Sequence, residues 1–168
     1  MAARVLGVDP GSAATGWALI VAEGNRYRLE ASGVVRPKGG DRVERLADLE
    51  RRFLEVVERL RPDCAAVESS FSGRNPRSGL QLAESRGVIL AALGRRAIAT
   101  SSYSPAEIKS AIVGHGGAEK HQVAYMVTRL LSLAAEPARD AADAIAVGLT
   151  HLHSQRPKML VDGRWRSC

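Results

Sequence analysis

Residues 4–16 read R-V-L-G-V-D-P-G-S-A-A-T-G, and this stretch decides the fold of the chain. Its apolar part ends at a single carboxylate, Asp9, and the chain turns directly afterwards through Pro10, Gly11 and Ser12. A continuous apolar run bounded by turn residues predicts a strand that is buried on both faces of a sheet. A carboxylate at the end of such a strand costs free energy unless hydrogen bonds or a cation compensate for the lost water. Asp9 is therefore expected either to accept hydrogen bonds from the backbone of its own turn or to lie beside a positive charge.

The rest of the sequence predicts a mixture of strands and helices. A meander of three strands comes first, and amphipathic helices then alternate with two further strands. The expected strands cover residues 5–8, 15–22, 27–36, 64–68 and 97–100, and the expected helices cover 41–60, 77–93, a short segment from Pro105, 118–132 and 138–153. Because crossovers between parallel strands are right-handed, the last two strands are expected to lie parallel to the first. The predicted fold class is α/β: a five-stranded mixed sheet, an antiparallel meander plus two parallel strands, with helices on both faces.

Length and composition indicate one globular domain. The chain has 168 residues, of which 45% are hydrophobic and 25% charged. We expect the domain to cover residues 1–153 and a basic, flexible C-terminal tail to cover residues 154–168. The chain has no apolar run of about 20 residues and does not begin like a signal peptide, so the expected compartment is the cytoplasm and no membrane partner is expected.

The positive charge is concentrated in the middle of the chain. The formal net charge is +6, and residues 73–129 alone carry 8 Lys and Arg against 3 Asp and Glu. Such a concentration is typical of a surface that faces a polyanion such as nucleic acid. The alternative is charge that is simply solvated and keeps the protein soluble.

Four carboxylates stand at positions where the predicted fold brings them together. Asp9 and Glu68 end two parallel strands, so both are expected at the same edge of the sheet. Asp140 and Asp143 are three residues apart near the start of a helix and share one of its faces. Each acid has an ordinary explanation when it is taken singly, since acids favour the positive end of a helix and polar residues favour strand ends and turns.

The four acids together favour a metal site. Two carboxylates about 4 Å apart repel each other by roughly 4 kcal/mol at an effective dielectric constant of 20. A cluster of four would therefore require divalent cations, and a ligand set made only of oxygen suits Mg²⁺ or Mn²⁺. Two such ions activate a water molecule and stabilise the leaving oxygen in phosphodiester hydrolysis.

The motifs resemble those of the RuvC family of Holliday junction resolvases, within the RNase H-like nucleases. The resemblance covers residues 5–153 and rests on four motifs in the order and at the spacing of the family. They are G-V-D-P-G-S-A-A-T-G at 7–16, A-V-E-S-S-F at 66–71, G-G-A-E-K-H-Q-V at 116–123 and D-A-A-D-A-I-A at 140–146.

The resemblance implies an RNase H-like fold and a structure-specific endonuclease. It implies that Asp9, Glu68, Asp140 and Asp143 are the catalytic carboxylates that bind metal, with two Mg²⁺ or Mn²⁺ ions in each active site. It further implies a homodimer that binds four-way junction DNA and makes paired symmetric cuts in homologous recombination and DNA repair. The family also works with the RuvA–RuvB branch-migration complex, which is therefore an expected partner.

Five further residues are candidates for DNA contact. The resemblance places Lys109 and Lys120 in the catalytic and DNA-binding surroundings. Phe71 stands in a polar loop after Glu68, where an exposed aromatic ring stacks on an unpaired base, although it is also able to fold back onto the core. Arg74 and Arg77 flank this loop as phosphate ligands or as solvated surface charges.

Two other functions compete with this interpretation. Sugar kinases and ATPases of the actin-like class also open with a strand, an Asp and a Gly-rich turn, but their architecture needs two lobes and this chain has the length of one. A junction-binding scaffold without catalysis is the second alternative, and acids that face DNA would weaken its binding. The apolar helix segment 88–93 is compatible with a dimer interface or with burial against the sheet.

Overall fold

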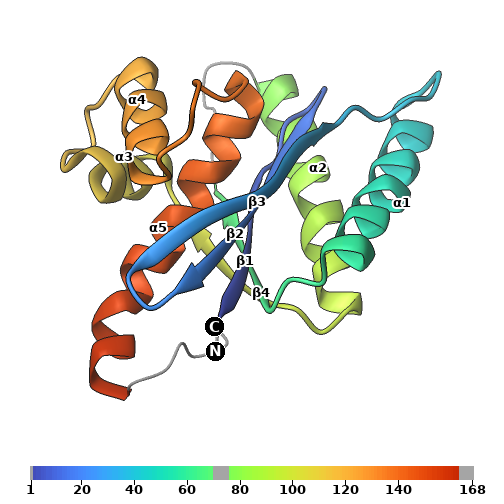
Figure 1. Ribbon diagram of the computed structural model, residues 1–168. Coiled ribbons are helices and arrows are strands. Elements are labelled where there is room, and N and C mark those ends of the chain that lie inside the picture. Colours follow the sequence, from blue (N-terminus) through green and yellow to red (C-terminus); the bar gives the residue numbers. More distant parts are fainter. Residues whose placement is uncertain (1, 70–75, 163–168) are drawn as a thin grey trace.

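The computed structural model describes residues 2–69 and 76–162, which form one mixed sheet with helices on both sides (Figure 1). Its strands are β1 (Ala3–Asp9), β2 (Thr15–Glu23), β3 (Arg26–Val35), β4 (Cys64–Glu68) and β5 (Ala99–Tyr103). The strand order is β3-β2-β1-β4-β5, in which β1, β2 and β3 pair antiparallel and β1, β4 and β5 pair parallel. The predicted meander and the two parallel strands are confirmed.

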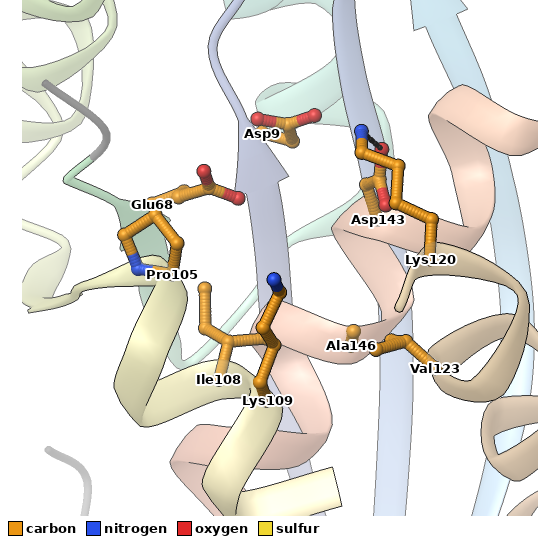
Figure 2. A pocket seen from close by; sticks show the side chains of 9 residues that line it. All are labelled: Asp9, Glu68, Pro105, Ile108, Lys109, Lys120, Val123, Asp143 and Ala146. Carbon is orange, nitrogen blue, oxygen red and sulfur yellow. Dashed lines mark hydrogen bonds and ion pairs between the residues drawn. The ribbon is translucent and has the colours of Figure 1, made fainter. Parts of the chain in front are cut away.

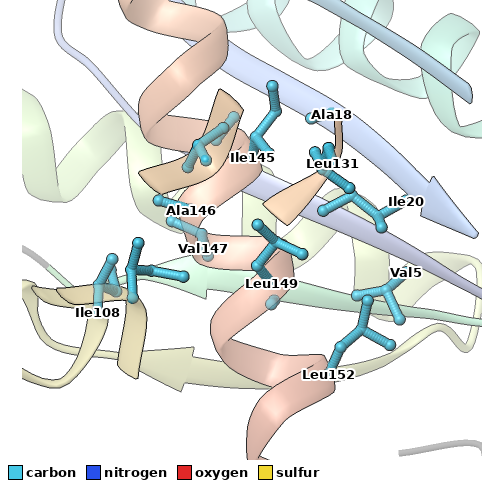
Figure 3. Packing of buried hydrophobic residues seen from close by; sticks show 14 of the residues in the cluster. Val5, Ala18, Ile20, Ile108, Leu131, Ile145, Ala146, Val147, Leu149 and Leu152 are labelled. Atoms are coloured by element: carbon cyan, nitrogen blue, oxygen red, sulfur yellow. The ribbon is translucent and has the colours of Figure 1, made fainter. Parts of the chain in front are cut away.

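Two hydrophobic cores fill the two faces of the sheet. Helices α1 (Arg42–Leu60) and α2 (Pro76–Arg95) cover one face, where Phe53 and Ile89 pack on Leu6 and Leu19. Helices α3 (Pro105–Val113), α4 (Lys120–Leu130) and α5 (Arg139–Asp162) cover the other face. Figure 3 shows this second core, in which side chains of α5 lie between the sheet and those of α3 and α4.

Local capping explains where the helices around the site begin. The side chain of Asp41 accepts a hydrogen bond from the backbone N–H of Glu44 and caps α1. Helix α3 begins with Pro105 after a capping box between Ser104 and Glu107. These caps set the directions of two helices whose first residues lie at the carboxyl ends of the parallel strands.

The approach of α5 to the sheet depends on glycines. A Cβ atom placed on Gly7 of β1 would lie 2.1 Å from the carbonyl oxygen of Ala144, and one placed on Gly16 of β2 would lie 2.1 Å from that of Asp140. The backbone of α5 therefore touches the backbone of β1 and β2 directly. Because Gly16 pairs with Asp9 across the two strands, this contact brings the first turn of α5 over the end of β1.

Among the predicted boundaries that differ from the structure, those of the last strand and the last helix differ most. The strand expected at 97–100 begins at Ala99, because Ala97 adopts a left-handed conformation (φ 52°) and its N–H caps α2 by bonding the carbonyl of Gly94. Helix α5 does not end at residue 153 but continues to Asp162. The hydroxyl of Ser154, 2.9 Å from that of Tyr103, ties the start of the predicted tail to β5.

The flexibility of the tail stays a prediction, and its last residues, 163–168, lie outside the described residues. Among the helices that the structure describes, none is long and apolar enough to cross a membrane.

Candidate active site

A cavity of about 270 Å³ opens at the edge of the sheet where β1 and β4 end (Figure 2). Strands β1 and β4 supply two of its acids, α5 supplies the third, and α3 and α4 supply the remaining wall. Its lining consists of Asp9, Glu68, Pro105, Ile108, Lys109, Lys120, Val123, Asp143 and Ala146. Three of the four predicted carboxylates and both predicted lysines thus line one cavity.

The two strand-borne acids are neighbours because of the sheet register. Strands β1 and β4 pair in parallel with Val8 opposite Val67, so the next residues, Asp9 and Glu68, lie side by side. The end of β4 is held in turn by Arg86, whose guanidinium donates to the carbonyl of Glu68 at 3.3 Å. In Figure 2 both carboxylates point into the cavity, as does Asp143 from α5.

Asp9 is a partly buried acid with a strongly perturbed pKa. The pKa of its carboxyl group is raised from 3.8 to about 7, first by burial and then by the negative charges of Glu68, Asp143 and Asp140. Lys120 acts in the opposite direction and lowers the pKa of Asp9. No hydrogen bond to the carboxylate of Asp9 occurs within the described part of the chain. Of the two expectations, hydrogen bonds from the turn are therefore not found, and the neighbouring positive charge is that of Lys120.

The two helix-borne acids carry cationic partners. The Nζ of Lys120 lies 3.3 Å from Oδ2 of Asp143, and Nη2 of Arg36 lies 3.0 Å from Oδ2 of Asp140. Asp140 does not line the cavity, and its carboxylate lies beside Arg36 at the end of β3. Nothing in the local sequence around Arg36 marked it as a partner of an acid 104 residues away.

The acids fit a hard divalent cation by their chemistry. Carboxylate oxygens suit Mg²⁺ or Mn²⁺, and the pKa of Asp9 is raised by burial and by neighbouring acids whose charge such a cation would neutralise. Among the described residues, however, no three acid, His or Cys side chains are grouped tightly enough to hold an ion. In this structure Lys120 and Arg36 neutralise Asp143 and Asp140 instead.

The predicted DNA-contacting residues fall into three groups. Lys109 from α3 and Lys120 from α4 line the carboxylate cavity, and Figure 2 shows the Nζ of Lys109 pointing toward it. Arg77 lies at the start of α2 and lines a different cavity on the opposite face of the sheet. Phe71 and Arg74 lie outside the described residues.

The comparisons with known proteins decide the family. The family model described as "Crossover junction endodeoxyribonuclease RuvC" matches residues 5–151. The chain belongs to the RuvC family. It is 46% identical over 150 residues to the crossover junction endodeoxyribonuclease RuvC of Alkalilimnicola ehrlichii, and the aligned region covers 89% of this chain and 91% of that relative. The resemblance inferred from the motifs is confirmed.

Solved structures of this family share the fold. The structure of Thermus thermophilus RuvC matches with a TM-score of 0.84 and 33% identity, over 94% of this chain and 97% of that one. The same protein in complex with a Holliday junction substrate matches with a TM-score of 0.86 and 33% identity, over 93% and 96% of the two chains. The RNase H-like fold class is confirmed.

Proposed function

We propose that this protein resolves Holliday junctions by metal-dependent hydrolysis of phosphodiester bonds, as a crossover junction endodeoxyribonuclease acting in homologous recombination and DNA repair. The observation that carries the proposal is the juxtaposition of Asp9, Glu68 and Asp143 around one open cavity, with Asp140 one helical turn before Asp143. The relatives named above support the substrate, because one of them forms a complex with a Holliday junction.

The residues assigned to the metal are Asp9, Glu68, Asp140 and Asp143. Held by these residues, Mg²⁺ or Mn²⁺ ions would supply an activated water and positive charge near the leaving oxygen. The protein's own part is to present deprotonated oxygens: Asp9 must lose its proton, and Asp140 and Asp143 must exchange Arg36 and Lys120 for the metal.

The lysines of the cavity are assigned to the DNA. Lys109 faces the carboxylates from α3 and is suited to bind the scissile phosphate or a neighbouring one. Lys120, once it leaves Asp143, is placed to bind negative charge at the same centre. Phe71 is proposed to stack on a base near the cut, with Arg74 and Arg77 on flanking phosphates.

A homodimer follows from the symmetry of the proposed reaction. Paired symmetric cuts in a four-way junction require two active sites related by a twofold axis. Helix α2 supports this assembly, since Leu80 is 62% exposed and Ala91 is also exposed on its outer side, while Ile89 and Leu93 are buried against the sheet. The RuvA–RuvB branch-migration complex is the proposed partner of the dimer through the family resemblance alone.

The proposal is tested with Asp9→Asn and Glu68→Gln in a junction cleavage assay with Mg²⁺ or Mn²⁺. We expect both variants to bind a four-way junction while cleavage falls by at least about a hundredfold, because each change removes one oxygen ligand of the metal. Linear duplex serves as the control substrate, and Glu55→Gln, an exposed change on α1, serves as the control variant.

Two results would contradict the proposal. Cleavage at the wild-type rate in either variant would remove these carboxylates from the mechanism. A wild-type protein that binds junctions and cuts none of them with any divalent metal would instead be the non-catalytic scaffold.

A further inference from the structure

A second cavity, of about 250 Å³, lies at the same edge of the sheet but on the face covered by α1 and α2. It is formed by the turn that follows Asp9, the start of α1 and the start of α2. Its lining consists of Ser12, Gly40, Asp41, Arg42, Arg45, Arg77 and Gln81. The strand β1 and its turn therefore separate a cavity lined by acids from a cavity lined by arginines.

One arginine of this cavity serves as a structural link. The guanidinium of Arg42 donates to Glu84 at 2.7 Å, to the hydroxyl of Ser85 at 3.0 Å and to the carbonyl of Gln81. These bonds tie the first turn of α1 to α2 and neutralise the charge of Arg42 with that of Glu84. The cavity wall is thus held in place before any ligand arrives.

Arg45 lines the same cavity, and its buried Nε has no hydrogen-bond partner among the described residues. The guanidinium also forms no ion pair within that part of the chain, whereas Arg42, one turn earlier on α1, is fully engaged. The side chain as a whole is partly exposed, and it is this one N–H donor that is buried. Since a buried donor without a partner costs free energy, its position beside a cavity indicates an anionic ligand.

We propose that this arginine cavity binds a backbone phosphate of junction DNA through the guanidinium of Arg45, with Arg77 at the rim. This inference rests on the proposed function and extends it to a second phosphate site. The planar fork of arginine matches the geometry of a phosphate group. The turn at Ser12 lies three residues after Asp9, so the second cavity adjoins the carboxylate cavity along the chain.

The inference is tested by the salt dependence of junction binding in EDTA, where no cleavage occurs. Arg45→Gln removes the proposed ligand, and Gln81→Glu places a negative charge in the cavity wall at nearly constant shape. Arg59→Gln is the matched control, because it removes the same charge from the last turn of α1, roughly 21 Å along the helix at 1.5 Å per residue. A fluorescent four-way junction is titrated at salt concentrations from about 50 to 200 mM, the range over which phosphate contacts are lost.

We expect both cavity variants to bind the junction about tenfold more weakly than the wild type. The slope of log affinity against log salt concentration should fall by about 0.9 for Arg45→Gln, the value for one lost phosphate contact. Melting curves show whether each variant is folded. If Arg45→Gln does not fold, Gln81→Glu still tests the proposal.

Affinity and slope equal to those of Arg59→Gln in both folded variants would overturn the proposal. A second arm adds inorganic phosphate in melting experiments. Stabilisation of the wild type by phosphate that Arg45→Gln abolishes, together with unchanged junction binding, would assign the cavity to a free anion and overturn the assignment to DNA. Failure of the wild type to cut junctions is a separate result that concerns the proposed function alone.

Discussion

The four acids reach the edge of the sheet on two kinds of element, and the two pairs differ in how their charge is compensated. Asp9 and Glu68 end adjacent parallel strands and are fixed side by side by the backbone ladder. Asp140 and Asp143 come from the first turns of α5 and pair with Arg36 and Lys120. We call Asp9 and Glu68 the strand pair and Asp140 and Asp143 the helix pair. The negative charge of the strand pair is held in place by the sheet, whereas each acid of the helix pair is neutralised by a cationic side chain.

This difference explains how a cluster of acids survives in a metal-free protein. The cost of the cluster is concentrated on Asp9, whose pKa rises to about 7, so that this acid holds a proton near neutral pH. The helix pair avoids that cost because its cations are already present. A divalent metal would therefore displace a proton from the strand pair and side chains from the helix pair.

The largest expected effect is a change in stability when the charge of Asp9, in the strand pair, is removed. In the metal-free protein Asp9→Asn should be more stable than the wild type at pH 8, by up to about 4 kcal/mol, since a shift from 3.8 to about 7 at 1.36 kcal/mol per unit sets the upper limit. The folded wild type keeps the proton that the unfolded chain releases near pH 4, so its relative stability falls as the pH rises from about 4 to 7 and the two proteins converge below pH 4. Urea unfolding in EDTA across this range measures the difference.

The matched change in the helix pair is Asp140→Asn. Its side chain is 43% exposed and its ion pair with Arg36 is a surface pair, so the stability should change by less than about 1 kcal/mol at any pH in this range. An equal gain in stability at pH 8 from both variants would show that the two pairs do not differ in the way described.

The second effect concerns the contact that joins the two pairs. Gly16→Ala should destabilise the protein by about 1–3 kcal/mol and reduce junction cleavage more than tenfold, because the added Cβ meets the carbonyl of Asp140 and pushes the start of α5 away from Asp9. Melting temperature and cleavage rate are the two measurements. Gly94→Ala is the control, since a Cβ on this α2 residue meets nothing within 4 Å; it should be neutral or slightly stabilising. Wild-type cleavage in Gly16→Ala would mean that the close packing does not position the helix pair.

The same contact marks the limit of what the sequence predicts. That Asp9 and Glu68 lie side by side follows from the order and register of the strands. Both can be predicted from the hydrophobic runs and from the right-handed crossover rule. The place of Asp140 and Asp143 depends on how closely α5 approaches the sheet, and that distance is set by Gly7 and by the glycine opposite Asp9. Both glycines lie in the first sequence motif, but the periodicity of hydrophobic residues does not predict which helix packs against them.

Residues that act through distant contacts were missed for a similar reason. Arg36 belongs to a strand in the sequence pattern, and only the tertiary fold brings it to Asp140. Arg45 has the spacing of an ordinary polar residue on an amphipathic helix, and only the packing of α2 over α1 buries its Nε. The extension of α5 past residue 153 likewise brings Ser154 to Tyr103 of β5, a contact that only the tertiary fold makes.

The smallest expected effect is a difference in Mn²⁺ affinity between variants of Lys120 and Arg36, the two cationic partners of the helix pair. Lys120→Gln should tighten Mn²⁺ binding two- to fivefold at pH 8, because the lysine no longer competes for Asp143, while cleavage falls because the lysine no longer faces the DNA. Arg36→Gln should change Mn²⁺ affinity less than twofold, since Asp140 is 43% exposed, against 24% for Asp143, and solvent weakens its pair with Arg36 more. Titration of Mn²⁺ followed by electron paramagnetic resonance, without DNA, gives both affinities. Weaker Mn²⁺ binding in Lys120→Gln would mean that the lysine orients Asp143 for the metal, and the helix pair would then be preorganised like the strand pair.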